Sequence, residues 1–148
     1  MKTSTKKRII TIIILVAMLG SSITYAIISA VPSQNEVQAS WGARLIIVIF
    51  GEQSTVPADI GVTNETRTKL FTLNSDGMVY KTGTEDATLG DFFKIWGENF
   101  NSTCILDYCN NGNSSMVMYV FQNGKWVQNS EYENYVIKNG DDIMVDYR

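Results

Sequence analysis

The side chains that could do chemistry in this 148-residue chain are mainly carboxylates, because the sequence has no histidine and only two cysteines. Without imidazole, the chain lacks the commonest general base and the usual ligand for transition metals. Asp142 and Asp146 share one face of the last predicted strand, but the rise per residue places them about 13 Å apart. That separation exceeds the roughly 5–9.5 Å between the two acids of a glycosidase. Together with Asp141 they also lack the ligand spacing of a calcium loop, so we expect no catalytic residue, metal site or cofactor.

The two cysteines, Cys104 and Cys109, are separated by four residues. In a protein outside the cytoplasm, a pair this close indicates a disulfide. A redox-active pair usually has two intervening residues and lies at a helix start, and a metal site needs more ligands than two thiols. We predict a structural disulfide, whose small loop contributes on the order of 2 kcal/mol to stability by the chain-entropy model.

Three asparagines fit the acceptor pattern for N-glycosylation: Asn64 in N-E-T, Asn101 in N-S-T and Asn113 in N-S-S. Two of them flank the cysteine loop, which predicts that this loop lies at the surface. The pattern is compatible with a glycosylated protein outside the cell, although Asn, Ser and Thr are common throughout the body of the chain.

A basic start followed by a long apolar run marks the N-terminal region. Four basic residues within positions 2–8 precede the uncharged residues 9–31. As a helix, those 23 residues extend about 34 Å, enough to cross a bilayer core of about 30 Å. Because basic residues stay on the cytoplasmic side, we predict a cytoplasmic tail (1–8), a single-pass anchor in the lipid bilayer (9–31), a stalk (32–40) and an extracytoplasmic domain (41–148). The alternative is a cleaved secretory signal that uses residues 9–19 and gives a secreted protein.

Charge is distributed unevenly along the chain. Four of the 12 basic residues lie in the first eight positions, whereas all 15 acidic residues lie beyond residue 35. Residues 36–148 therefore have 8 basic and 15 acidic residues, for a net charge of −7. An acidic surface without a basic stripe argues against nucleic-acid binding and against docking of the body onto anionic lipid.

Hydrophobic periodicity predicts that most of the body is β-sheet. Residues 44–50 are continuously apolar and rich in β-branched side chains, so they form a buried strand, and residues 52–61 form a loop. Asn123-Gly124 is a strong hairpin signal. The remaining predicted strands cover residues 66–73, 78–82, 116–122, 125–128 and 142–147.

One helix is predicted in the body, over residues 88–96. Thr88 caps it, with Asp91 in a capping-box relation, and Gly97 ends it. This order of elements predicts an α+β fold of the β-grasp type, in which a mixed sheet wraps one helix and the first and last strands lie parallel at the centre. An immunoglobulin-like β-sandwich is the alternative fold.

Residues 76–147 carry a series of short motifs. They are D-G-M at 76–78, T-L-G-D-F-F at 88–93, F-N-S-T-C at 100–104, Y-C-N-N-G at 108–112, N-G-K at 123–125 and G-D-D-I at 140–143. In their order and spacing, the chain resembles small secreted or membrane-anchored β-grasp proteins of ammonia-oxidising archaea. The resemblance implies the same fold and location. Those proteins often carry a His-x-His pair after the Asp-Gly turn, but residues 78–82 read M-V-Y-K-T here, so no metal role carries over.

The predicted sheet has more apolar surface than one helix can cover. Alternate residues of a strand point to opposite faces, yet residues 45–50 and 116–121 are apolar on both faces. We predict that the second face docks a protein partner or a second copy of the chain, unless a loop of the same chain covers it. The predicted docking residues are Ile46, Val48, Phe50, Val117, Tyr119 and Phe121. The expected function is a non-catalytic binding or accessory module of a membrane or envelope complex, and a glycosylated cell-surface component is the alternative.

Overall fold

The structure, a computed structural model, describes Ala39 and residues 41–148. The predicted tail, the predicted membrane anchor and most of the predicted stalk therefore lie outside the described residues. Within the part of the chain that is described, no helix is long and apolar enough to cross a bilayer.

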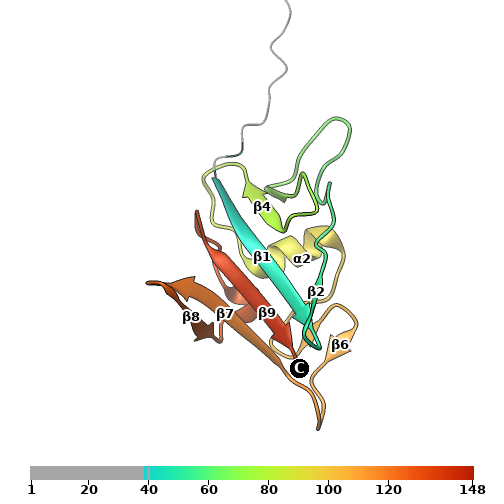
Figure 1. The fold of residues 1–148 in the computed structure, drawn as a ribbon. Helices are drawn as coiled ribbons and strands as arrows, with labels where there is room; N and C mark the ends of the chain where they lie inside the picture. The colour runs from blue at the N-terminus through green and yellow to red at the C-terminus, as the bar shows by residue number, and fades with distance from the viewer. Residues whose placement is uncertain (1–38, 40) are drawn as a thin grey trace, which may run out of the picture. The chain divides into compact units, whose positions relative to one another are not determined.

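The described chain is a mixed α+β structure, mostly sheet with one α-helix (Figure 1). The strands are β1 (Trp41–Ile49), β2 (Glu52–Ser54), β3 (Leu70–Phe71), β4 (Met78–Lys81), β5 (Cys104–Ile105), β6 (Tyr108–Cys109), β7 (Met116–Gln122), β8 (Lys125–Asn129) and β9 (Asp142–Tyr147). The α-helix is α2 (Leu89–Trp96), and a short 3-10 helix, η1, covers Tyr132–Asn134. These elements confirm the α+β class that the sequence predicts.

Seven strands form one sheet in the order β3-β4-β1-β9-β7-β8, with β2 beside β1. The first and last strands, β1 and β9, are parallel neighbours, as expected for a continuously apolar first strand. The other pairings in this sheet are antiparallel. On its other edge, β1 pairs with β4 over its first half and with β2 over its last residues. The first and last strands of the domain therefore pair with each other at the middle of the sheet.

One face of the sheet packs against α2 and forms the core (Figure 1). In β1 the alternate residues Ala43, Leu45 and Ile47 are buried. The helix contributes its apolar stripe, in which Phe92 and Phe93 are buried. In β7 and β9 the buried side chains are Met116, Met118, Val120, Ile143, Val145 and Tyr147. Each of these three strands thus presents one face to the helix and the other face away from it.

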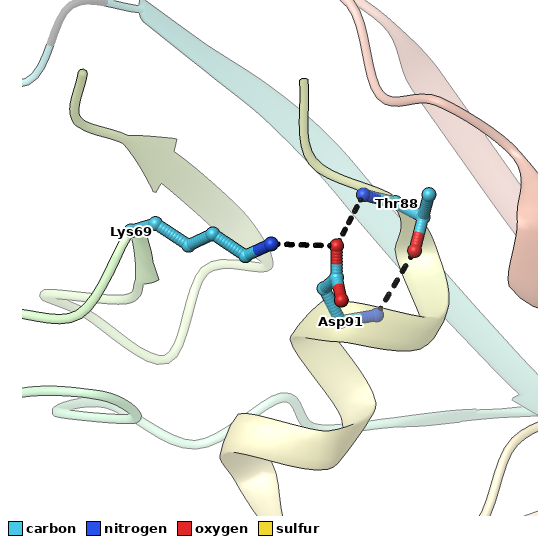
Figure 2. A network of polar contacts seen from close by, with 3 residues as sticks. All are labelled: Lys69, Thr88 and Asp91. Carbon is cyan, nitrogen blue, oxygen red and sulfur yellow. Dashed lines mark hydrogen bonds and ion pairs between the residues drawn. The ribbon is translucent and has the colours of Figure 1, made fainter. Parts of the chain in front are cut away.

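Figure 2 shows the predicted capping box at the start of α2. Thr88 Oγ1 accepts a hydrogen bond from the backbone N–H of Asp91 at 3.1 Å, and Asp91 Oδ2 accepts one from the N–H of Thr88 at 3.0 Å. The same carboxylate oxygen accepts a hydrogen bond from Lys69 Nζ at 2.8 Å. The bonds from Lys69 and Thr88 hold the pKa of Asp91 below its ordinary value. At the other end, Gly97 has a φ of 85° and ends the helix in the left-handed conformation.

The prediction that residues 52–61 form only a loop is wrong. The chain reverses at Phe50-Gly51, and β2 pairs back on the end of β1. The rest of the segment turns its apolar side chains inward, so that Val56 and Ile60 are buried in the core. This segment therefore closes the core beside β1, where β4 does not extend.

The predicted strand over residues 66–73 is longer than the observed one, since β3 covers only two residues. Before β3, the N–H of Thr68 donates to the Gly61 carbonyl at 2.9 Å. After β3, the N–H of Thr72 donates to the Ile60 carbonyl at 3.0 Å. The chain on both sides of β3 is thus bonded to the preceding loop instead of to β4.

Replacing Asp91 with alanine removes the carboxylate that holds the helix start. We expect Asp91→Ala to lower the free energy of unfolding by about 1 kcal/mol near neutral pH, because half of the capping box is lost. Since the folded state lowers the pKa of Asp91, its carboxylate stabilises the fold above the unfolded pKa, and this contribution is lost as the pH falls through the folded pKa. The difference between the variant and the parent, measured by urea unfolding of the full chain, should therefore shrink in acid.

The control is Asp107→Ala, which removes an exposed carboxylate in the turn between β5 and β6. It should change the free energy of unfolding little at either pH. Equal losses for the two variants, or a loss for Asp91→Ala that persists in acid, would contradict the capping role.

Candidate functional site

The face of the sheet that points away from α2 is built from the residues between the buried ones. Register places Ile46 beside Met144 and Met144 beside Tyr119, in one row across β1, β9 and β7. Val48 and Val117 lie in the next row, on either side of β9. We call this group of partly buried apolar side chains the outer face; it consists of Ile46, Val48, Val117, Tyr119 and Met144.

Neither of the two loops that could cover the outer face does so. The loop after β2 packs on the helix side, where Val56 and Ile60 belong to the core. The cysteine loop also contributes to the core, through the fully buried Ile105. In the view of Figure 1, α2 lies behind the sheet and no described segment crosses in front of β9. Within the described part of the chain, the outer face therefore has no backbone segment over β9, and its five side chains remain partly accessible.

Charged pairs border the outer face. Arg44 donates from Nε and Nη2 to the two carboxylate oxygens of Asp142, both at 2.9 Å, and this hydrogen bonding raises the pKa of Arg44. At the other end of β9, Arg148 Nη1 lies 3.6 Å from Asp146 Oδ2. Arg148 Nη2 also donates to the Tyr119 hydroxyl at 3.2 Å. A molecule that docks here meets an apolar centre with ion pairs at its edge.

The carboxylates that the sequence offers for chemistry have structural partners. Asp142 and Asp146 are paired with arginines. Asp141 Oδ2 accepts hydrogen bonds from the Tyr135 hydroxyl and from the backbone N–H of Lys138, each at 2.8 Å. Burial and the bond to Asp141 raise the pKa of Tyr135. Among the described residues, no group of three or more His, Cys, Asp or Glu side chains is placed to hold a metal ion.

Phe50 lies in the turn that follows β1, apart from the other predicted docking residues. Its φ of 51° and the φ of 84° at Gly51 are both positive, as in the two-residue turns of tight hairpins. The Phe50 ring packs edge-on against Tyr147, at 5.3 Å between centroids, and against Tyr108, at 5.8 Å. Because Tyr147 lies on the core side of β9, Phe50 covers the end of the core and does not join the outer face.

Phe121 lies on the same side of the sheet as the outer face, but near the end of β7. There it pairs with Trp126 of β8, and the two ring centroids are 5.3 Å apart. Trp126 is absent from the predicted docking residues, although the Asn123-Gly124 turn sets its position opposite Phe121. These two rings form an exposed aromatic pair at the tip of the hairpin.

The predicted disulfide between Cys104 and Cys109 is confirmed. The two cysteines lie opposite each other in the small β5–β6 sheet. The Tyr147 hydroxyl donates to the Cys109 carbonyl at 2.7 Å and accepts a hydrogen bond from Asn111 Nδ2 at 3.2 Å. The cysteine loop is thereby tied to the last strand, close to Phe50.

The three sequon asparagines lie in loops and not on the outer face. Asn64 and Asn113 are exposed. Asn101 is partly buried, and its Oδ1 accepts hydrogen bonds from the N–H and hydroxyl of Thr103 and from the N–H of Cys104, at 2.8, 2.9 and 3.0 Å. Asn101 therefore shapes the turn that leads into the disulfide, whereas the other two asparagines are accessible.

A cavity of about 320 Å³ lies beside the start of α2, and no sequence pattern predicts it. Its lining includes Gly90 and Lys94 of the helix, Glu98 just after it, and Glu133 of η1. Glu133 Oε2 is buried without a hydrogen-bond partner. Glycine is needed at position 90, because a Cβ there would lie 2.7 Å from the Glu133 carbonyl oxygen. The cavity arises where η1 approaches α2, a contact that periodicity does not encode.

The structural role of Asn101 is testable against the other two sequons. We expect Asn101→Ala to lower the free energy of unfolding by about 1 kcal/mol, because three donors in the turn lose their acceptor. Asn64→Ala and Asn113→Ala are matched controls and should leave stability almost unchanged. Urea unfolding of the three full-chain variants measures this, and equal effects at all three positions would rule out the role assigned to Asn101.

No protein-family model, curated protein or solved structure matches this chain.

Proposed function

We propose that this protein is a membrane-anchored, extracytoplasmic accessory module that binds another protein through its outer face and catalyses no reaction. Residues 9–31 serve as the anchor, and residues 32–40 serve as the stalk. Because such an anchor confines the domain to the bilayer surface, the partner is a component of a membrane or envelope complex.

The observation that carries this proposal is the open outer face. Its apolar side chains come from β1, β9 and β7 and lie in adjacent rows of the sheet. Contiguous apolar side chains that stay partly accessible on the face of a sheet are candidates for a binding site. The border formed by Arg44 with Asp142 and by Arg148 with Asp146 supplies the polar rim that surrounds the apolar centre of a typical interface.

We assign the domain to the β-grasp type. The parallel pair of β1 and β9 at the centre of the sheet and the single helix packed on one face support this assignment. An immunoglobulin-like sandwich would instead pack a second sheet where α2 lies. The resemblance of residues 76–147 to β-grasp proteins of ammonia-oxidising archaea favours the same fold.

A glycosylated cell-surface component is the second candidate, and the exposure of Asn64 and Asn113 favours it. Glycans on these loops would leave the outer face free. The two candidates therefore differ in one respect, which is whether the outer face is occupied by another protein.

Site-specific photocrosslinking in native membranes tests the docking of the outer face. A photoreactive phenylalanine analogue replaces either Tyr119, at the centre of the outer face, or Tyr108, in the cysteine loop, in the full chain. We expect one discrete adduct from position 119 and none from position 108. Mass spectrometry of the adduct identifies the partner, and a mass of two chains would identify a second copy.

Met144→Lys is the matched disruption, because it places a charge beside Tyr119 on the outer face and leaves the core face intact. It should abolish the adduct from position 119 without loss of the disulfide. Adducts in equal yield from both positions, or none from position 119, would contradict the proposal.

A further inference from the structure

We infer that the tip of the β7–β8 hairpin enters the headgroup region of the bilayer to which the chain is anchored. We call Phe121, Lys125, Trp126 and Val127 the hairpin tip. The inference rests on the proposed anchor at residues 9–31. It adds the orientation of the domain relative to the bilayer. With the tip at the membrane, the strands stand upright on the bilayer and the outer face is turned sideways, toward neighbouring membrane proteins.

Each face of the hairpin tip carries at least one exposed apolar side chain. Phe121 is 42% exposed, Trp126 is 38% exposed and Val127 is 37% exposed. Phe121 and Trp126 lie on one face, whereas Val127 points to the other and pairs with Val120. Docking of a protein on the outer face would cover only the first of these faces. A membrane interface surrounds a tip on all sides, and tryptophan is among the residues enriched there.

The register of the sheet places the tip at the end of the domain where the chain arrives from the stalk. Val120 of β7 pairs with Ile143 of β9, and Ile143 pairs with Leu45 of β1. Beyond Val120, β7 ends in the Asn123-Gly124 turn, and before Leu45, β1 begins at Trp41. By register, the hairpin turn and the start of β1 therefore lie at the same end of β9.

Chain length favours contact at this end. The nine residues 32–40 reach at most about 30 Å when fully extended. The tip lies three strands away from β1, which is about 14 Å across the sheet and within that reach. The opposite end of β1 is about 26 Å from Trp41. To bring that end to the bilayer, the stalk would have to run almost fully extended beside the domain, at a cost in conformational entropy.

The exposed aromatic residues at the opposite end already have a structural role. Phe50, Tyr108 and Tyr147 form a cluster with centroid distances of 5.8, 5.3 and 5.5 Å. Tyr147 is buried and connects this cluster to the core. The cluster therefore closes the core, whereas the hairpin tip extends beyond the core.

Charge near the tip indicates which bilayer suits it. Lys125 is exposed beside Trp126, and its ammonium group can reach lipid phosphate while its stem stays among apolar groups. Glu85 and Asp86 follow β4 and lie at the same end of the sheet, but on the other side of β1. Because residues 36–148 carry a net charge of −7, the contact depends on aromatic insertion. We therefore expect it on zwitterionic lipid.

Fluorescence quenching in the full chain tests this orientation. Gln122→Cys, beside the turn of the tip, and Gln53→Cys, in β2 at the opposite end, change two exposed glutamines that lie in or next to tight hairpins. Because both native cysteines form the disulfide, an NBD label has one site in each variant. The labelled chains are reconstituted into phosphatidylcholine vesicles, with or without lipid that carries a nitroxide in its upper acyl chain.

We expect the label at position 122 to be quenched at least about threefold more strongly than the label at position 53, with a blue-shifted emission. Equal quenching of two variants that float with the vesicles would overturn the orientation and leave the anchor standing. A chain that does not float with the vesicles would overturn the anchor and the orientation together. A blue shift without nitroxide quenching indicates burial by protein, and would also overturn the inference.

The side chains of the tip are tested by Phe121→Ser combined with Trp126→Ser in the Gln122→Cys chain. Quenching at position 122 should fall to the level at position 53, while flotation with the vesicles is unchanged. Quenching that persists would show that these two rings do not hold the tip in the bilayer. The comparison of positions 122 and 53 uses the parent tip, so it decides the orientation even where the double variant fails to fold.

Discussion

The parallel pairing of β1 with β9 is the constraint on which the rest of the structure depends. It joins the two ends of the domain at the middle of the sheet, from the pair Arg44 and Asp142 to the pair Ile49 and Tyr147. Because side chains alternate with a period of two, a shift of one residue would exchange the core face with the outer face. On the helix side, such a shift would expose the buried side chains. On the other side, it would break the ion pair between Arg44 and Asp142.

This single register produces two surfaces with different roles. On the helix side, the strands supply the core that α2 covers. On the other side, the same strands supply the outer face, which no loop of the described chain covers. The hairpin tip is a third feature, because β7 and β8 continue past the core and carry their aromatic side chains with them. A domain that holds its tip at the bilayer and its outer face sideways is suited to association within the plane of the membrane.

Local chemistry explains which parts of the fold can be predicted from the sequence. The capping box, the Asn123-Gly124 hairpin, the disulfide and the apolar first strand all depend on residues close together in the chain. The strand β2 is not predicted, because Phe50 is atypical of the first position of the turn, although Gly51 is typical of the second. The same turn moves Phe50 away from the outer face, where strict alternation would place it. The cavity at Glu133 cannot be predicted from the sequence for another reason. It depends on contact between η1 and α2, which lie far apart in the sequence.

The central claim is that the outer face is occupied when the protein is in its membrane. Hydroxyl-radical footprinting of the full chain, in native membranes and after purification in detergent, tests it most directly. Met144 reports on the centre of the outer face, and the exposed Phe50 is an internal reference outside that face. The account predicts that oxidation of Met144 is several-fold slower in native membranes than after purification, while oxidation of Phe50 is unchanged. Equal oxidation rates of Met144 in the two samples would contradict it.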